Sequence, residues 1–300
     1  MIDERVMVPS GDARLAVRVR GREGARPLLV LGPGPGLPLL PEAKRIERGL
    51  TLDGSWLTAY VDPRGCGASR GGAVAVDESI ADVGVLARWL AARAGAPVTV
   101  LGMSIGASFA IAAAARDPAA VRAVVGLGAD IDLAETDASA HAFLASAAAA
   151  RGLRAVRAVA GIAATVLDAR TFQRRARWLT ELGGMQRDLQ WGTLLRRTMA
   201  GLLRTYGPIG AIRALRAMAR VQDAMLPPLS TFAMWSVRQV KVPITLVHGD
   251  ADVLSPIASA RRWLDALEAP ATQMTIVRGG RHVPHEEAPE LVRGVLRGLA

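Results

Sequence analysis

Short apolar runs, each ending in turn residues, recur in the first and last parts of the chain. Residues 13–20 alternate apolar side chains with arginines, a pattern typical of a half-exposed strand. The remaining runs are apolar throughout, as in parallel strands that are covered on both faces. They cover residues 27–31, 57–62, 98–102, 121–128, 242–250 and 274–277.

Helical spacing fills the intervals between these runs. Within residues 78–94 the apolar side chains recur on one helical face, at Ile80, Val83, Leu86, Ala87 and Leu90. Further helices are expected over residues 105–116, 256–268 and 286–299. This alternation predicts an α/β fold with a mostly parallel central sheet that helices cover on both faces.

The alternation stops near residue 132 and resumes near residue 240. The segment between is rich in alanine and arginine and has no strand-like run. Its helical pattern is broken at Gly183-Gly184, Gly207-Pro208 and Pro227-Pro228. We therefore expect a core made of residues 1–132 and 240–300, interrupted by a helical insertion over residues 133–239.

Residues 98–115 carry no charge, and eighteen such positions are enough for a candidate membrane span. A spanning segment must be helical throughout to satisfy its backbone. Here β-branched residues come first, and Gly102 and Gly106 flank Ser104 where the pattern changes. A buried strand, a sharp turn and a helix explain all of these features, so no membrane span is expected.

The composition is that of a globular protein. Of the 300 residues 51% are hydrophobic and 21% are charged, which argues against a disordered chain. The N-terminus is charged from Asp3 onward and lacks the apolar segment of a secretory signal. Cys66, the single cysteine, lies in a glycine-rich turn and fits a reducing cytoplasm. We expect a cytoplasmic monomer or homodimer.

The net charge of +10 is concentrated in the insertion. Residues 151–220 hold fourteen arginines, no lysine and three acidic residues. Clustered positive charge suggests nucleic acid, but the segment carries no nucleic-acid-binding motif. Arg151, Arg154 and Arg157 follow helical spacing, which indicates solvated helix faces and no nucleic-acid partner. Anionic substrates and acidic surfaces stay open as alternatives.

Gly102-Met103-Ser104-Ile105-Gly106 is the one G-x-S-x-G pattern in the chain. In such a pattern the serine occupies a strained turn between a strand and a helix, which exposes its hydroxyl above the sheet. Because a strand-like run precedes the pattern and a helical segment follows it, Ser104 is predicted to be a nucleophile. A glycine–serine turn without reactivity is the alternative.

A serine nucleophile needs a histidine base, and the chain has four histidines. In the order Ser, acid, His the base follows the last strand, which favours His282 over His285. His141 is expected to be structural or to line the insertion, and His248 to pack or hydrogen-bond locally.

The acid is expected after the preceding strand, where Asp250 and Asp252 stand. An acid in this role holds the imidazole in one tautomer. Asp252 lies further into the loop and is favoured for it, whereas Asp250 is expected to brace the turn.

The reaction also needs N–H donors for the developing oxyanion. Ile105 supplies one from its backbone, and Gly34 is the donor left in GPGPG because Pro33 and Pro35 have none. Leu37 breaks the G-x-G-x-x-G phosphate pattern, and the His282-x-x-His285 pair lacks further metal ligands. No metal and no cofactor are expected.

Four separate segments resemble motifs of the α/β-hydrolase superfamily, in particular its proline iminopeptidase-like serine hydrolases. PLLVLGPGPG (27–36) is similar to P-V-L-L-V-H-G-G-P-G of that family, and DPRGCGAS (62–69) to its D-Q-R-G-C-G-x-S. HGDADVLSP (248–256) and GGRHVPHEEAPE (279–290) resemble its acid and histidine loops.

This resemblance implies an α/β-hydrolase fold, the roles of acid and base for Asp252 and His282, and a helical cap formed by the insertion. It also implies a substrate amine bound by cap carboxylates, for which Glu181 is the candidate. Ile105, however, replaces the tryptophan usual after the nucleophile in true proline iminopeptidases, and the cap is dominated by arginine.

We therefore expect a serine hydrolase that acts on carboxylic esters or amides, including short peptides, through an acyl-enzyme. A proline-releasing aminopeptidase, a non-hydrolytic lyase or cyclase, and a basic binding scaffold are the alternatives. The pocket is expected to be apolar and to select neutral acyl groups. Candidate cap residues for its lining are Phe143, Leu144, Trp178, Leu182, Trp191, Met199, Met218 and Trp235, although packing between cap helices explains them equally. Among them Trp178 and Trp191, together with Glu181, are the candidate substrate contacts.

Overall fold

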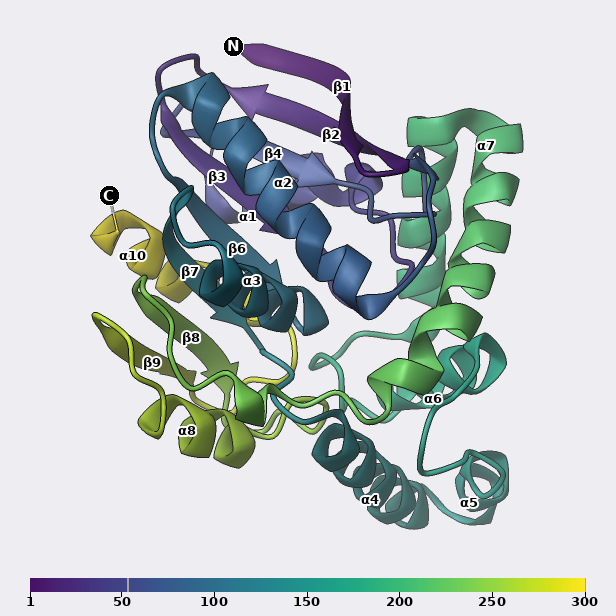
Figure 1. Cartoon of the computed structure of the whole chain (residues 1–300). Coiled ribbons are helices and arrows are strands. Elements are labelled where there is room, and N and C mark those ends of the chain that lie inside the picture. Colours follow the sequence, from purple (N-terminus) through teal and green to yellow (C-terminus); the bar gives the residue numbers. More distant parts are fainter. Residues whose placement is uncertain (53, 300) are drawn as a thin grey trace.

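A mixed sheet forms the centre of the molecule in the computed structural model, which describes residues 1–52 and 54–299 (Figure 1). The strand order is β1-β2-β4-β3-β6-β7-β8-β9, and β5 pairs with β2. β1, β2 and β5 pair antiparallel, whereas the strands from β4 to β9 along this order are parallel. The strands are β1 (Ile2–Ser10), β2 (Ala13–Gly21), β3 (Arg26–Leu31), β4 (Trp56–Val61), β5 (Arg70–Gly71), β6 (Val98–Met103), β7 (Val121–Leu127), β8 (Ile244–Gly249) and β9 (Thr272–Val277).

Helices cover both faces of this sheet, which confirms the α/β fold expected from the sequence. On one face α2, α3 and α8 pack against Leu29, Val100 and Val124. On the other face α1 and α10 pack against Val30, Leu101 and their neighbours. These helices, with the short α9, are α1 (Ala43–Leu50), α2 (Val76–Ala94), α3 (Ile105–Arg116), α8 (Ile257–Asp265), α9 (Pro284–Glu287) and α10 (Pro289–Gly298).

The segment between β7 and β8 is helical, and we call it the cap. A short 3-10 helix, Met234–Ser236, leads from it back to the sheet. The cap helices are α4 (Leu133–Arg151), α5 (Leu153–Val159), α6 (Ala169–Glu181) and α7 (Trp191–Leu229).

The expected breaks in the cap are found at two of three places. α6 ends before Gly183, whose φ is 77°. Within α7 the backbone at Gly207 is non-helical (φ 70°, ψ 176°), and the chain reverses there so that Leu202 packs against Ala214. At the third place the end of the helix differs from the expected break by one residue: Pro227 and Pro228 lie in the last turn of α7, which ends at Leu229.

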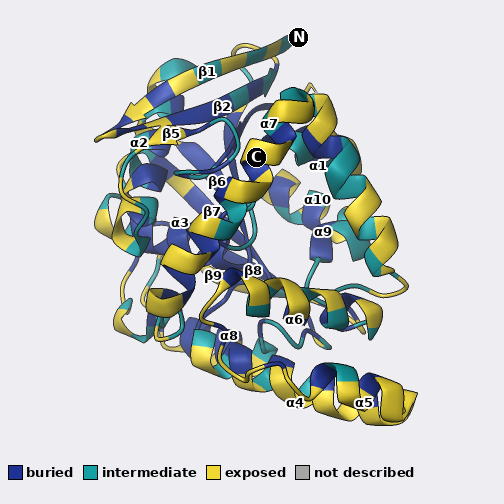
Figure 2. Ribbon diagram, turned by 90° about the vertical axis from the view of Figure 1, so that its right-hand side faces the viewer, coloured by how far each residue is buried: buried dark blue, intermediate teal, exposed yellow. Residues whose placement is uncertain are grey.

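The arginines of the cap lie mostly on its outer surface, as expected. Figure 2 shows the central strands buried and the cap helices widely exposed. Of the fourteen arginines in residues 151–220, twelve are exposed. Arg197 is half-buried and pairs with Glu286, whereas Arg175 is buried.

One buried carboxylate, that of Asp62, joins the cap to the core. Its Oδ1 accepts hydrogen bonds from the backbone N–H groups of Leu39 and Leu40, both at 3.0 Å. Its Oδ2 accepts from the N–H of Ala68 at 2.9 Å and from the hydroxyl of Tyr206, in α7, at 2.6 Å. Through Asp62, the DPRGCGAS segment thus holds the α7 hairpin against the sheet.

Tyr206→Phe should lower the free energy of unfolding by about 2 kcal/mol, because it removes a hydrogen bond to a buried carboxylate. A urea unfolding series measures this change. In the Asp62→Ala background the same substitution should have little effect. If Tyr206→Phe cost as much there as in the wild type, the Asp62–Tyr206 bond would not be the source of the loss.

Candidate active site

Ser104 stands in a strained turn between β6 and α3. Its backbone has φ 52° and ψ −128°, a region that side chains rarely adopt. A Cβ at Gly102 would lie 2.4 Å from Cα of Ala107, and one at Gly106 would lie 2.5 Å from the carbonyl oxygen of Gly32. The two glycines are therefore required by close backbone approach on either side of the serine.

Three loops bring Ser104, Asp252 and His282 together at the carboxyl ends of the parallel strands. Nε2 of His282 lies 3.0 Å from Oγ of Ser104, and Nδ1 lies 3.0 Å from Oδ2 of Asp252. The remaining oxygen of Asp252 accepts hydrogen bonds from the N–H groups of Leu254 and Ser255 at 2.8 and 3.0 Å. A hydroxyl, an imidazole and a carboxylate arranged in this way can act as nucleophile, base and orienting acid.

The electrostatics of this group fit the same roles. Burial alone would lower the pKa of His282, but the adjacent Asp252 carboxylate outweighs it and holds that pKa above its usual value. Burial likewise opposes ionisation of Asp252, yet His282 and the backbone N–H bonds keep its pKa below the usual range. An ionised Asp252 stabilises positive charge on the imidazole.

The other histidines lie in different surroundings. His285 is buried beside Glu286, and burial lowers its pKa to about 4. His248 is buried too, and its Nε2 accepts a hydrogen bond from the N–H of Ala129 at 3.0 Å. This agrees with the local packing or hydrogen bond expected for it. His141 is exposed on α4, so the expectation of a structural or lining role is wrong. Asp250 accepts from the N–H of Gly279 at 2.5 Å and braces the turn, as expected.

A second carboxyl group at Ser104 was missed by the sequence analysis. Asp130 follows β7, is 4% exposed, and places its Oδ2 2.7 Å from Oγ of Ser104. Its Oδ1 accepts hydrogen bonds from the hydroxyls of Ser255 at 2.6 Å and Thr136 at 3.3 Å. The available signal was its place at the end of the strand next to β6, since carboxyl ends of adjacent parallel strands meet at one edge.

Gly34 and Ile105 lie beside Ser104 in the lining of one cavity. The backbone of Gly34 is left-handed, with φ 69°, which favours glycine there. Ile105 is the first residue of α3, so its N–H has no acceptor within the helix. Both residues therefore lie near the serine, and the role of their N–H groups as oxyanion donors stays a prediction.

The cavity above Ser104 has a volume of about 190 Å³ and is mostly apolar. Its wall on the α6 side follows helical spacing, with Phe172, Arg175, Ala176 and Leu179 at positions i, i+3, i+4 and i+7. Further lining residues from the cap and the adjoining segments are Leu133, Thr136, Asp137, Val166, Met185, Leu226, Leu229 and Ser230.

None of the eight cap residues expected to line this cavity is among its lining residues. Trp178 and Trp191 line a separate open groove on the outside of the cap. Glu181 is exposed, and its carboxylate accepts a hydrogen bond from the N–H of Trp191 at 3.2 Å. Phe143, Leu144 and Leu182 pack with Trp178 in a cluster between cap helices. The expected lining was wrong because apolar spacing shows which face of a helix is buried. It does not show whether that face packs against another helix or lines a cavity.

Arg175 is the one fully buried arginine of residues 151–220, and it lines the cavity as an ion pair. Its guanidinium bonds to the carboxylate of Asp137. The other oxygen of Asp137 accepts from the N–H of Val166 at 3.0 Å. The pair contributes no net charge to the cavity wall.

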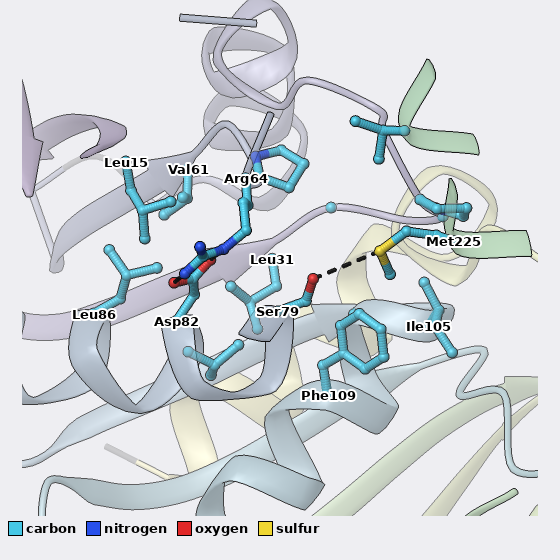
Figure 3. A pocket seen from close by; sticks show the side chains of 18 residues that line it. Leu15, Leu31, Val61, Arg64, Ser79, Asp82, Leu86, Ile105, Phe109 and Met225 are labelled. Carbon is cyan, nitrogen blue, oxygen red and sulfur yellow. Dashed lines mark hydrogen bonds and ion pairs between the residues drawn. The ribbon is translucent and has the colours of Figure 1, made fainter. Parts of the chain in front are cut away.

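A second, smaller cavity of about 70 Å³ is lined by residues of the Gly34 loop, α2 and α3 (Figure 3). Gly34, Pro35 and Ile105 line both cavities. At its inner end Arg64 donates to Asp82 at 2.7 and 3.0 Å. Because these charged groups satisfy each other, the second cavity offers apolar space beneath the loop.

The part of the chain that the structure describes holds no group of three or more His, Cys, Asp or Glu side chains suited to bind a metal. Within those same residues, no helix has the length and apolar character needed to cross a membrane.

The chain belongs to the alpha/beta hydrolase family, whose model matches residues 28–295. It is similar in fold to a proline iminopeptidase-related protein from Thermus thermophilus, with 20% identity over 100% of this chain and 97% of that chain and a TM-score of 0.64. The protein VinJ is 19% identical over 98% of this chain and 97% of that chain, with a TM-score of 0.67. A proline iminopeptidase of Mycobacterium smegmatis is 18% identical over 99% of this chain and 97% of that chain, with a TM-score of 0.64. A search of curated proteins finds no match. The family supports an enzyme of the α/β-hydrolase kind, and these structural neighbours share its fold.

The buried His248 makes stability depend on pH. Burial lowers its pKa from 6.5 to about 4, so the unfolded chain binds a proton that the folded chain excludes. Stability should therefore fall as the pH drops from about 6.5 towards 4, by about 2 kcal/mol between pH 7 and pH 5 from this residue.

Urea unfolding of wild type and His248→Gln at about pH 7 and pH 5 measures this contribution. The decrease in unfolding free energy should be smaller in the variant by about 2 kcal/mol, whatever the variant's absolute stability. Equal decreases in the two proteins would show that folding does not lower the pKa of His248.

Proposed function

We propose that this protein is a serine hydrolase that cleaves carboxylic esters or amides through an acyl-enzyme on Ser104. The observation that carries the proposal is the chain of contacts from Ser104 Oγ to His282 Nε2 and from His282 Nδ1 to Asp252, each at 3.0 Å. The strained backbone of Ser104 at a helix N-terminus supports it independently.

In the proposed reaction His282 takes the proton of Ser104 as Oγ attacks the substrate carbonyl. The N–H groups of Ile105 and Gly34 donate to the oxyanion that forms. The protonated His282, held by Asp252, then gives its proton to the leaving alcohol or amine. Water attacks the acyl-enzyme with His282 again as base, and Ser104 is released.

The cavity favours neutral substrates of moderate size. Its walls are largely apolar, and the Arg175–Asp137 pair carries no net charge. The exposed Glu181, bonded to Trp191, gives no support to recognition of a substrate amine at Ser104, so ester and amide hydrolysis is favoured over aminopeptidase activity. Epoxide hydrolases are among the structural neighbours, but the contacts that join Ser104 to His282 and His282 to Asp252 favour a serine nucleophile.

A fluorophosphonate probe should label the wild type and leave Ser104→Ala unlabelled, because phosphonylation needs the serine oxygen. Asp252→Asn should be labelled about 10⁴-fold more slowly, since the imidazole is then held in the wrong tautomer. Intact-protein mass spectrometry over time measures both. Equal labelling of wild type and Ser104→Ala would reject Ser104 as the nucleophile.

The KM for neutral p-nitrophenyl esters should change by less than about twofold between low salt and about 150 mM salt. The exposed arginines lie outside the cavity, and screening acts on exposed charges over ~8–10 Å. Initial rates at a series of salt concentrations test this. A several-fold rise of KM with salt, together with a preference for a carboxylated ester, would show that arginines attract the substrate.

A further inference from the structure

The hydroxyl of Ser104 lies between a carboxyl group and an imidazole nitrogen, and each of these accepts a hydrogen bond when it carries no proton. Its Oγ is 2.7 Å from Oδ2 of Asp130 and 3.0 Å from Nε2 of His282. A hydroxyl has one hydrogen, so it can donate to one of these neighbours only. The other contact is a hydrogen bond only if that neighbour carries a proton of its own.

The surroundings of Asp130 favour the proton on its carboxyl group. Its side-chain partners among the described residues are all hydroxyls: those of Ser104, Ser255 and Thr136. Complete burial raises the pKa of Asp130 and is the largest effect; the nearby Asp252 carboxylate raises it too, whereas His282 and the hydrogen bonds from Ser255 and Ser104 lower it. Oδ1 already accepts two hydrogen bonds, which leaves Oδ2, the atom at Ser104, to carry the hydrogen.

We propose that Asp130 acts as a neutral carboxylic acid that donates a hydrogen bond to Oγ of Ser104, as a second catalytic acid of the site. The hydrogen bonds then run in one direction, from Asp130 to Ser104, from Ser104 to His282 and from His282 to Asp252. Each hydrogen has one acceptor, and Nε2 of His282 stays free to take the serine proton. This inference rests on the proposed serine hydrolase function.

In the reaction the donor assists the departure of the serine. When the acyl-enzyme is hydrolysed, the bond between the carbonyl carbon and Oγ breaks and its electron pair passes to Oγ. Oγ takes the proton from Nε2 of His282, while the hydrogen of Asp130 remains on its carboxyl group and stabilises the developing charge. The proton count of Asp130 is unchanged over the cycle.

The groups that face Asp130 set the pH at which this donor is lost. Ser104 contacts it from the turn before α3, Thr136 from α4 and Ser255 from the loop after β8, while Asp252 and His282 act on it from their loops without contact. Since the neutral form of Asp130 predominates below its raised pKa, ionisation as the pH rises through that pKa should reverse the Ser104 hydrogen bond and slow the attack.

Asp130→Asn and Asp130→Ala separate a neutral donor from an ionised acceptor. The asparagine amide donates to Ser104 and its carbonyl accepts from Ser255 and Thr136, as the neutral acid does, whereas alanine removes both. Fluorophosphonate labelling rates are measured from neutral to alkaline pH. Asp265→Asn, on the exposed end of α8, is the matched control, and thermal unfolding checks that each variant is folded.

We expect Asp130→Asn to be labelled within about threefold of the wild-type rate, and Asp130→Ala at least about tenfold more slowly. The wild-type rate should decline on the alkaline side, and the Asp130→Asn rate should not decline there. If Asp130→Asn is as slow as Asp130→Ala, or keeps the alkaline decline, Asp130 is not the neutral donor. If the wild type itself is not labelled at Ser104, the proposed function fails instead.

Discussion

The left-handed backbone of Ser104 is the constraint on which the site depends. The turn from β6 into α3 is sharp enough that glycine is required at positions 102 and 106, where a Cβ would meet backbone atoms at 2.4 and 2.5 Å. This turn lifts Oγ above the edge at which the parallel strands end. Asp130, Asp252 and His282 follow β7, β8 and β9, the next strands along the sheet, and so reach the same point. The site is therefore a consequence of sheet order.

The cap is joined to this edge by hydrogen bonds that also hold the loop of His282. The backbone N–H of His282 donates to the carbonyl of Met185 in the cap at 3.1 Å, and the N–H of Arg187 donates to Glu287 at 3.0 Å. At the other side Tyr206 reaches the buried Asp62. The cavity above Ser104 and the loop of His282 are therefore held by the same contacts, and a shift of the cap would move His282 relative to Ser104.

Much of this arrangement follows from local sequence signals. The buried strands, the turn at Ser104 and the loops of Asp252 and His282 each carry a pattern of spacing or turn chemistry. β1 was not predicted, although its apolar positions alternate weakly among charges, because pairing with β2 is what stabilises it. Asp130 has no motif of its own, and only the adjacency of β6 and β7 brings it to the serine. The prediction of the cap residues that line the cavity was wrong for a related reason, because tertiary packing decides which face of a helix meets the cavity.

Covalent attachment of substrate to Ser104 is the central claim, and rapid-mixing kinetics of a p-nitrophenyl ester test it most directly. The wild type should release a burst of p-nitrophenolate approaching one equivalent per enzyme where deacylation is slower than acylation. Acid quenching during the burst, followed by peptide mass spectrometry, should place the acyl mass on the peptide that contains Ser104. Turnover with the acyl mass on another residue, or with no acyl-enzyme under any condition that slows deacylation, would contradict the account.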